Sequence, residues 1–435
     1  MNKYEKYKDS GVAWIGEIPE HWEAVNVKRT LNTLTDFTAN GSFADLAKNV
    51  HYLECGYSRL VRLTDLRNSL NNNGIYVSRK SHEYLAKSVL YGGEILLANV
   101  GAYAGLACVM PRVKYPATLG PNMFLLKFKN NIDNLFAHYS FVSNYLSKQL
   151  INKSISSAQP KLNKDNVKEC LFIQPSIIEQ VRIVAYLDWK CGEVDKVVAV
   201  REEQIKLLGE LRTSIISRAV TKGLNPNAPL KDSGIAWIGS IPAHWDSYRF
   251  KFTTTQMTEA SKDANKIGLE NIESGTGGFI ASDTVFEGNG IGFIAGDIVY
   301  GKLRPYLQKV WLASEKGNAV GDFFVYRTKS NSQNRFIQYF MLSDLFTKVA
   351  DGATYGAKMP RVGSDFIANF PINLPPIDEQ QAIANYLDKK TAEIDSTIAK
   401  YKEQVAKLKE YRQALITEVV TGKIDVRDVV IPKNN

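Results

Sequence analysis

Cysteine is scarce in this sequence. The 435 residues include four cysteines, Cys55, Cys108, Cys170 and Cys191, and no two of them form a C-x-x-C pair. This spacing fits neither the usual zinc motifs nor a disulfide framework. We therefore expect all four cysteines to be small buried side chains.

Long apolar runs and export signals are also lacking. No run reaches the roughly 18 apolar residues of a membrane-spanning helix. The first ten residues, MNKYEKYKDS, lack the apolar core of a secretory signal. The sequence therefore predicts no membrane span and a cytoplasmic location.

Recognisable catalytic motifs are missing too. There is no Asn-Pro-Pro-Tyr methyltransferase loop, no phosphate-binding G-x-x-x-x-G-K-S/T motif and no dinucleotide-binding glycine motif. The nearest likeness, NLPPID at residues 373–378, has a leucine between the asparagine and the prolines, and its prolines suit the first turn of a helix. The histidines show no metal-ligand spacing. We therefore expect no catalytic residue, no cofactor and no metal on this chain.

Basic charge is unevenly distributed along the chain. The net charge is +9, and residues 23–174 hold 18 basic and 10 acidic residues, a net charge of +8. Residues 246–372 hold 14 basic and 13 acidic residues, a net charge of +1. A local basic excess favours nucleic-acid binding, although a total of this size also fits ordinary solubility.

An internal repeat organises the sequence. KDSGVAWIGEIPEHW at residues 8–22 returns as KDSGIAWIGSIPAHW at residues 231–245, which aligns Trp14 with Trp237 and Trp22 with Trp245. PSIIEQVRIVAYLDWKCGEVD from Pro175 matches PPIDEQQAIANYLDKKTAEID from Pro375. The stretches between these matches diverge. A duplicated frame that carries two unlike inserts suits a protein with two different recognition surfaces.

Each downstream match opens a predicted long helix. Between Ile177 and Val220 there is no proline, and apolar residues recur at helical spacing. The a and d positions of this helix are Leu187, Cys191, Val194, Val198, Arg201, Ile205, Leu208, Arg212 and Ile215. The same register in the second copy gives Leu387, Thr391, Ile394, Ile398, Tyr401, Val405, Leu408, Arg412 and Leu415. The shared register predicts that the two helices pack together.

We expect this pair to be an antiparallel coiled coil, because a pseudo-twofold repeat then places equivalent domains at opposite ends. Parallel pairing would set the domains side by side. At a rise of about 1.5 Å per residue, a helix of about 44 residues spans about 66 Å, so the pair would form a rigid rod. The alternative, that both helices are core elements of one large domain, is opposed by their uninterrupted length and charged flanks.

The remaining stretches mix short β-rich runs, such as EILLANV, MFLLKF, DIVYG and FFVYR, with helical patches. The predicted fold class is therefore α+β, with two α+β domains joined by the antiparallel coiled coil. The expected boundaries are a frame segment 1–22, a first domain 23–174, a long helix 175–222, a linker with the second frame segment 223–245, a second domain 246–372, a long helix 373–423 and a tail 424–435.

The best candidate DNA contacts lie in the loop GKLRPYLQKV of the second domain. Lys302, Arg304 and Lys309 alternate there with Tyr306, between two strand-like runs. Basic side chains hold phosphates, aromatic rings stack on bases, and arginine also fits guanine edges. We therefore predict that these four residues contact DNA.

Matching candidates lie in the loop ANVGAYAG of the first domain. Asn99 could read adenine and Tyr103 could stack, while the alternative is that the glycines only shape a turn. The loops SSAQPKL and YGAKMPR, ahead of the long helices, add Gln159, Lys161, Lys358 and Arg361 at equivalent repeat positions. The alternative for these loops is a solvated turn.

On these features the chain resembles the specificity subunit of type I restriction-modification enzymes. The motifs that carry the resemblance are DSGVAWIGEIPEHW and DSGIAWIGSIPAHW, PSIIEQVRIVAYLD and PPIDEQQAIANYLD, and the helix ends ISRAVTKG and ITEVVTGK. The resemblance implies that residues 23–174 and 246–372 are target recognition domains, each reading one half of a bipartite site in double-stranded DNA. The coiled coil would then set the spacer.

The resemblance also implies partners. Two methylation subunits would dock on the helical frame and use S-adenosylmethionine to methylate adenines flipped from the duplex. Two restriction/translocase subunits, which use ATP and Mg, would join for cleavage. The alternatives are a stand-alone DNA-binding scaffold or regulator and, less favoured by the absent motifs, a self-contained methyltransferase or nuclease.

Overall fold

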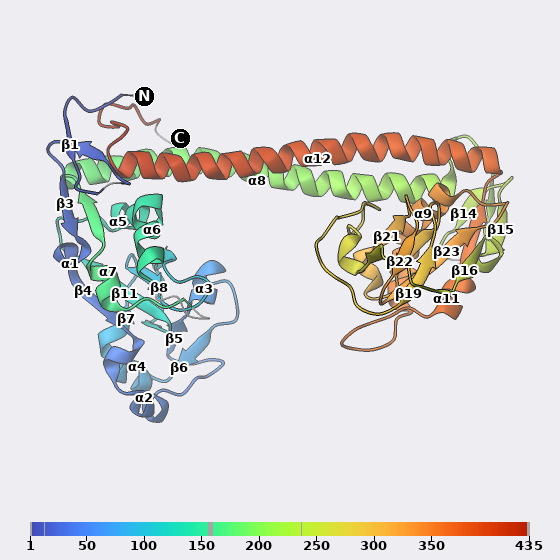
Figure 1. Ribbon diagram of the computed structural model, residues 1–435. Coiled ribbons are helices and arrows are strands. Elements are labelled where there is room, and N and C mark those ends of the chain that lie inside the picture. The colour runs from blue at the N-terminus through green and yellow to red at the C-terminus, as the bar shows by residue number, and fades with distance from the viewer. Residues whose placement is uncertain (1, 13, 155–159, 236, 433–435) are drawn as a thin grey trace. The chain divides into compact units, whose positions relative to one another are not determined.

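The computed structural model describes residues 2–12, 14–154, 160–235 and 237–432, and the chain divides into two compact units (Figure 1). Unit 1 comprises Met1–Val200 and Gln404–Asn435, and unit 2 comprises Arg201–Glu403. Both boundaries fall inside the two long helices, α8 (Ile177–Lys222) and α12 (Ile377–Val420). Each unit therefore contains part of both helices. Among the helices of the described ranges, none is long and apolar enough to cross a membrane.

The helices α8 and α12 run side by side in opposite directions (Figure 1). In unit 1, Asp195 of α8 pairs with Arg412 of α12 at 3.0 Å. In unit 2, Arg212, which lies further along α8, pairs at 2.9 Å with Asp395, which lies earlier in α12. The predicted antiparallel coiled coil is confirmed.

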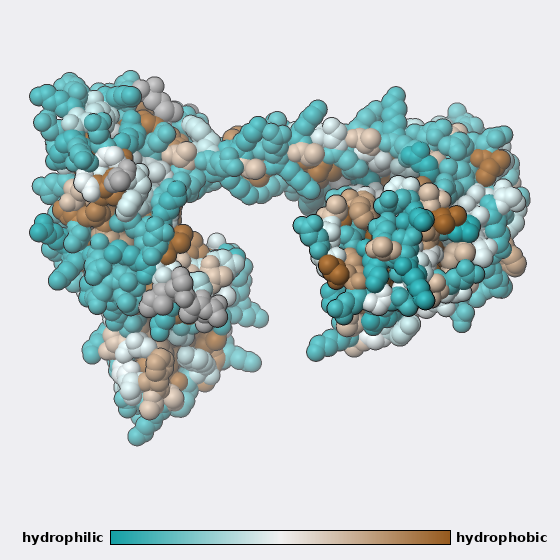
Figure 2. Space-filling view, in the orientation of Figure 1, coloured by the Kyte–Doolittle hydropathy of each residue, from teal (hydrophilic) through white to brown (hydrophobic). Residues whose placement is uncertain are grey.

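The seam between the helices is largely apolar, as predicted. In unit 1, Val194 and Val198 pack with Val405 and Leu408. Hydrophilic side chains cover most of the visible outer face of both helices (Figure 2). Since the two arginine pairs occupy seam positions, they help to specify one register over its alternatives.

The described part of unit 1 holds two four-stranded sheets and two short two-stranded ones. Strands β5 and β10 pair in parallel, and the other pairs in these sheets are antiparallel. The first large sheet has the order β4 (Leu31–Asp36), β11 (Met123–Phe128), β8 (Ile95–Ala98), β9 (Ala107–Val109), and the second β6 (Ile75–Val77), β5 (Ser58–Val61), β10 (Ala117–Leu119), β7 (Val89–Leu90). The short sheets pair β1 (Tyr7–Asp9) with β2 (Glu17–Pro19) and β3 (Glu23–Asn26) with β12 (Leu171–Gln174).

Short helices complete the part of unit 1 outside the long helices. They are α1 (Val27–Thr30), α2 (Phe43–Asn49), α3 (Leu63–Arg67), α4 (Arg79–Tyr84), α5 (Asn134–Val142), α6 (Asn144–Lys153) and α7 (Lys164–Lys168), with the 3-10 turns η1 (Phe37–Asn40) and η2 (Ala86–Ser88). The apolar faces of α5, α6 and the first large sheet share one core with the adjoining stretches of α8 and α12. This core attaches the predicted first recognition domain to the helices.

Unit 2 repeats this plan. Its first large sheet has the same kind of order, β16 (Thr254–Met257), β23 (Phe323–Thr328), β20 (Ile298–Gly301), β21 (Val310–Leu312), and the second is β17 (Ala260–Ser261), β19 (Gly290–Phe293), β22 (Gly317–Ala319), β18 (Lys266–Ile267), with one parallel pair, β18 and β22. The short sheets pair β13 (Leu230–Asp232) with β14 (Ser240–Pro242) and β15 (Asp246–Arg249) with β24 (Pro371–Leu374). The helices are α9 (Asn334–Leu342), α10 (Asp344–Gly352) and α11 (Ser364–Ala368), with the turns η3 (Phe250–Phe252), η4 (Leu269–Asn271) and η5 (Pro305–Leu307). The α+β class is therefore confirmed in both halves. The diverged inserts share the strand order of the first large sheet, whereas the second sheets differ at their edges: β6 lies beside β5 in unit 1, and β17 lies beside β19 in unit 2.

The repeated frame segment anchors the start of a long helix in each unit. In unit 1, the carboxylate of Glu179 on α8 accepts a hydrogen bond from Trp22 Nε1 at 3.2 Å and lies 3.0 Å from His21 Nε2. In unit 2, Glu379 on α12 accepts from Trp245 Nε1 at 3.3 Å. A carboxylate in the first turn also suits the positive end of the helix dipole. The repeated motif is thus a clamp on the helix start.

The two ends of the chain meet in unit 1. The backbone N–H of Asp425 donates to the carbonyl of Asn2 at 2.9 Å, and the hydroxyl of Tyr7 donates to the carbonyl of Gly422 at 3.1 Å. In unit 2, the corresponding stretch is continuous, because residues 223–232 lead from the end of α8 into β13.

The expectation for the cysteines is wrong in part. Cys170 and Cys191 are buried, but Cys55 is exposed and Cys108 is only half-buried. Cys55 lies in the exposed stretch 51–57, where no sheet or helix covers the side chains.

Candidate nucleic-acid interface

In unit 1, two of the loops singled out from the sequence lie against each other. The loop that follows β8 pairs with the segment ahead of α7, because Gly101 N–H donates to the carbonyl of Pro160 at 2.9 Å and Leu162 N–H donates to the carbonyl of Asn99 at 2.8 Å. This pairing brings Asn99, Tyr103 and Lys161 close together. Tyr103 and Lys161 are exposed, whereas Asn99 is half-buried and its Oδ1 is enclosed. Gln159, which was predicted with them, lies outside the described residues.

The corresponding loops of unit 2 meet in the same way. Arg304 N–H donates to the carbonyl of Pro360 at 2.8 Å, and Val362 N–H donates to the carbonyl of Lys302 at 3.1 Å. The pairing joins the loop GKLRPYLQKV to the segment that contains Lys358 and Arg361. Each unit therefore holds one candidate interface built by the same backbone connections.

The match between the two interfaces extends to individual positions. An isolated bridge joins Val100 to Lys161 in unit 1 and Leu303 to Arg361 in unit 2. Counting onward from these bridges, the exposed rings of Tyr103 and Tyr306 occupy equivalent positions, with exposed fractions of 45% and 52%. An exposed ring beside cationic side chains is suited to stack on a base or a sugar.

Arg304 has an unusual backbone conformation. Its φ of 51° lies in the left-handed region, which its equivalent in unit 1, Gly101, occupies with a φ of 87°. Such a conformation is uncommon for a residue with a Cβ and persists only where the surroundings hold it. The hydrogen bond to Pro360 provides that restraint and leaves the Arg304 side chain exposed.

The charges of the two interfaces are arranged differently. In unit 2, both guanidinium Nε and Nη2 of Arg361 contact the carboxylate of Asp322, at 2.9 and 2.8 Å, and Lys302 Nζ lies 3.9 Å from it. The hydrogen bonds to Asp322 raise the pKa of the Arg361 guanidinium. In unit 1, Asn122 occupies the position of Asp322, and Lys161 has no acidic partner within the described ranges. The charge of Lys161 is therefore freer to meet a phosphate than that of its equivalent, Arg361.

Lys309 and Lys358 lie in different environments. The ammonium of Lys309 donates to the carbonyls of Leu269 and Ile272 at 2.7 and 2.8 Å, and burial lowers its pKa. Two of the three N–H donors of its ammonium group are thus engaged by backbone carbonyls of the protein. Lys358 is exposed on the loop ahead of α11.

Sequence reasoning missed a further cation beside the unit 1 interface. The guanidinium of Arg67, at the end of α3, lies 4.2 Å from the centroid of the Tyr103 ring. This cation–π contact adds charge and fixes the ring's orientation. The sequence holds no signal for it, because the two side chains lie far apart along the chain.

The free charge of Lys161 leads to a prediction on the salt dependence of DNA binding. We expect Lys161→Ala to weaken binding to all sequences. It should also reduce the magnitude of the negative slope of log K against log salt by about 1, which corresponds to the loss of one phosphate contact. Asp322→Asn gives unit 2 the amide found in unit 1. It should increase the magnitude of that slope, because it releases Arg361 from its ion pair with Asp322. Titrations of the assembled complex at several salt concentrations measure both. Lys148→Ala, on an exposed lysine of α6, is the control, and an unchanged slope for Lys161→Ala would contradict the assignment.

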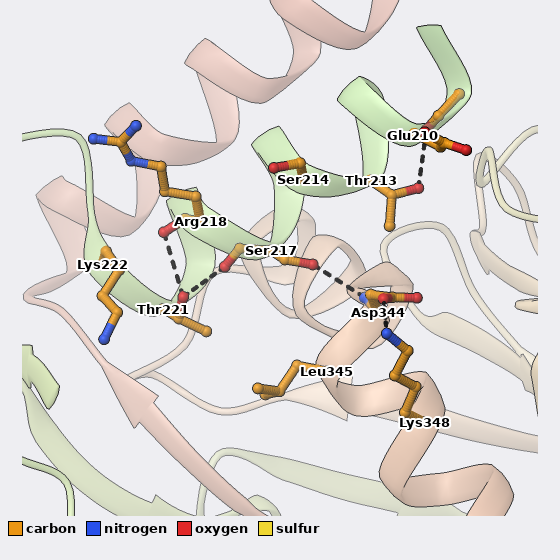
Figure 3. Close-up of a pocket in the computed structure, with 11 residues that line it drawn as sticks. Glu210, Thr213, Ser214, Ser217, Arg218, Thr221, Lys222, Asp344, Leu345 and Lys348 are labelled. Atoms are coloured by element: carbon orange, nitrogen blue, oxygen red, sulfur yellow. Dashed lines mark hydrogen bonds and ion pairs between the residues drawn. The ribbon is translucent and has the colours of Figure 1, made fainter. Parts of the chain in front are cut away.

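The helical frame of unit 2 has a groove of about 930 Å³, which is lined mostly by residues with polar or charged side chains (Figure 3). Its walls are the last turns of α8 and the first turn of α10, where Asp344 N–H donates to Ser217 Oγ at 3.1 Å. In unit 1, the equivalent bond joins Asn144 N–H to Thr417, but Gln413 reaches across to the carbonyl of Val142 at 2.7 Å. The long side chain of Gln413 thus covers in unit 1 the place of the groove, which the shorter Thr213 leaves open in unit 2.

Comparison with known proteins connects this architecture to one family. A family model described as the type I restriction modification DNA specificity domain matches residues 61–190 and 250–407. The putative type I restriction enzyme MjaX specificity subunit of Methanocaldococcus jannaschii is 24% identical over 95% of this chain and 96% of its own. The type I restriction enzyme EcoDI specificity subunit of Escherichia coli is 24% identical over 64% of this chain and 67% of its own.

A solved structure has a similar fold. The structure concerns complex assembly and conformational transition of the type I R-M system, and the alignment covers 94% of this chain and 99% of the other. The TM-score is 0.68 and the sequence identity is 15%. This likeness supports the fold.

Proposed function

The chain belongs to the family of type I restriction-modification DNA specificity subunits, and on this premise we propose that its two units read the two halves of a bipartite site in double-stranded DNA. The observation that carries the proposal is the pair of equivalent loop interfaces, one in each unit, built by the same backbone hydrogen bonds. Their exposed side chains differ in kind and charge. Two unlike surfaces on one duplicated frame are suited to read two unlike half-sites.

The long helices set the spacer in this proposal. The chain passes from unit 1 to unit 2 within α8 and returns within α12. A paired helix is stiff along its axis, and its length is fixed by the constant rise that each helical residue adds. The number of base pairs between the half-sites should therefore follow the number of helical residues.

Partner subunits supply the chemistry. The described part of the chain contains no group of three or more side chains arranged to hold a metal ion. In the proposal, two methylation subunits bind S-adenosylmethionine and dock on the helical frame, and two restriction/translocase subunits bind ATP and Mg. This chain then acts as a non-catalytic subunit that chooses the DNA site.

The test is methylome sequencing of a host that expresses this chain with its neighbouring methylation subunit, beside a host without this chain. We expect a split motif with methyladenine in each half, on opposite strands, which disappears with the chain. An unchanged methylome, together with tight and specific DNA binding by the purified chain alone, would overturn the proposal in favour of a stand-alone DNA-binding scaffold.

A further inference from the structure

A strained loop projects from unit 1 beside the candidate interface. It has the sequence RNSLNNNG and connects α3 to β6 across residues 67–74. Ser69 and Leu70 both have left-handed backbones, with φ of 51° and 61°. Two successive residues with side chains rarely adopt this conformation, and they keep it only where the surroundings impose it.

A buried arginine imposes the loop conformation. Arg59 on β5 donates from Nη1 to the carbonyl of Leu70 at 2.8 Å, and from Nη2 to the carbonyl and side-chain oxygens of Asn72 at 3.2 and 3.0 Å. Gly74 lies directly over the guanidinium, and a Cβ there would approach Arg59 Nε to 2.7 Å. The backbone of the loop is thus fixed to the sheet beneath it.

A second charged group holds the same loop. The carboxylate of Asp65 accepts from Arg62 Nε and Nη2 at 3.0 Å each and from Asn72 Nδ2 at 2.7 Å. Burial opposes ionisation of Asp65, but the hydrogen bonds from Arg62 and Asn72 outweigh it and keep its pKa below the ordinary value. Buried ion networks contribute little net stability, and a fixed geometry is what they can supply.

The network separates the three consecutive asparagines by role. Asn72 uses both ends of its amide on Asp65 and Arg59. Asn71 and Asn73, on either side, are exposed, and within the described ranges their side chains make no hydrogen bond. One asparagine therefore anchors the loop, and the other two present free amides to solvent.

The surroundings of the loop suit a base edge better than a phosphate. A hollow of about 480 Å³ is lined by Asn72, Asn73, Gly74 and Tyr76 together with Glu54. The exposed carboxylate of Glu54 repels phosphate and accepts from exocyclic amino groups of bases. At the other end of the loop, Arg67 contacts Tyr103 of the candidate interface, so the loop extends that surface.

We propose that the loop 67–74 is a specificity-determining element of unit 1, in which Asn71 and Asn73 hydrogen-bond base edges in the major groove and Arg59 is the positioning residue. The inference rests on the proposed function, and it names the residues of unit 1 that contact the bases. An asparagine amide matches the N6 and N7 atoms of adenine. The base pairs read by this loop therefore include A·T pairs in one half-site.

The equivalent loop of unit 2 is built differently. Its backbone carbonyls at Gly275 and Thr276 accept from Arg212 of α8 at 2.8 and 3.1 Å. This loop is held against a long helix by its own main chain, whereas the loop of unit 1 holds free amides outward. The proposed reading element therefore belongs to unit 1, and its loss should affect one half-site.

The experiment compares the methylomes of hosts that carry the full system with Asn71→Ala, Asn73→Ala or the unchanged chain. Each substitution should relax selection at one or two A·T positions of one half-site by about 5- to 150-fold, with the other half-site unchanged. Asn130→Ala, on an exposed asparagine after β11, is the matched control and should leave both half-sites intact. Thermal unfolding of the purified complexes should show equal stability for all four chains.

Arg59→Lys tests the positioning role. Lysine keeps the charge but cannot bridge the three oxygens that the guanidinium fork reaches. We expect relaxed selection at the same base pairs as for Asn71→Ala and Asn73→Ala, a change that a loss of stability alone would not confine to those positions. Uniformly lower methylation with unrelaxed bases would show that Arg59 is only structural.

The outcomes separate this inference from the proposed function. If the unchanged chain directs no split motif, the proposed function fails. If the motif is present and both asparagine variants select every base as before, the loop does not read DNA and the inference is wrong. Relaxed selection in both half-sites would also contradict it.

Discussion

A four-residue insertion in α8 at Gln204 should lengthen the spacer of the methylated motif while leaving the bases of both half-sites unchanged. Four residues add about 6 Å of helix, which is close to two base pairs of B-DNA at about 3.4 Å each. Four residues are also close to one helical turn, so most side chains of α8 keep the face that they present to α12. The original motif should lose its methylation entirely.

Methylome sequencing of the insertion variant measures this effect directly. The same insertion at Gln404 of α12 should give the same change, and a chain with both insertions keeps the added segments of the two helices matched. A two-residue insertion is the control, because it rotates the seam by more than half a turn and should abolish methylation at every spacing. Altered bases within the half-sites would contradict the role of the helices as a spacer.

The second large effect concerns the clamp at the start of α8. Trp22 has an exposed fraction of 0%, and its indole N–H donates to Glu179. Trp22→Ala removes the largest buried side chain of the frame segment and leaves a cavity beside the buried carboxylate. We expect a loss of about 3–5 kcal/mol in the free energy of unfolding, measured by urea denaturation of the chain.

Trp14 is a matched control within the same repeated motif. Its exposed fraction is 62%, so Trp14→Ala should change the free energy of unfolding by about 0.5 kcal/mol or less. The two tryptophans stand in one repeated motif but differ in burial. Equal effects of the two substitutions would show that the clamp contributes nothing particular to stability.

The long helices could be predicted almost completely from the sequence. The helix expected within residues 175–222 runs from Ile177 to Lys222. The agreement arises because a helix of this length buries one continuous stripe, which leaves a periodic signal in the sequence. Even Arg212 and Arg412, which pair across the seam, were part of the predicted register, although their aspartate partners were not foreseen.

The candidate interfaces could be predicted only as separate loops. The sequence marks the loops around Tyr103 and Tyr306 by their composition and marks the segments at Lys161 and Arg361 by the repeat. Their pairing depends on where the sheets carry the chain, which local patterns do not encode. The same limit applies to charge, because Asp322 neutralises Arg361 from a distant point in the sequence.

The shared strand order of the first large sheets escaped sequence reasoning for a different reason. A strand needs only alternating or continuous apolar residues, which many sequences supply. The order of strands in the sheets of β4 and β16 is therefore retained, while little identity remains. The loop at Asn71 and Asn73 was missed because its conformation depends on hydrogen bonds from Arg59, a buried residue of a strand.

The contact between the chain ends makes the order of the segments partly arbitrary. Since the backbone of Asp425 already touches that of Asn2, a short peptide from the segment after Asp425 to Asn2 would close the polypeptide into a ring. In that ring, the junction of the old ends and the linker at residues 223–232 would be equivalent connections from a long helix to a frame segment. A gene opened at the second connection would encode a circularly permuted protein with the same two units, in which the present second half is translated first.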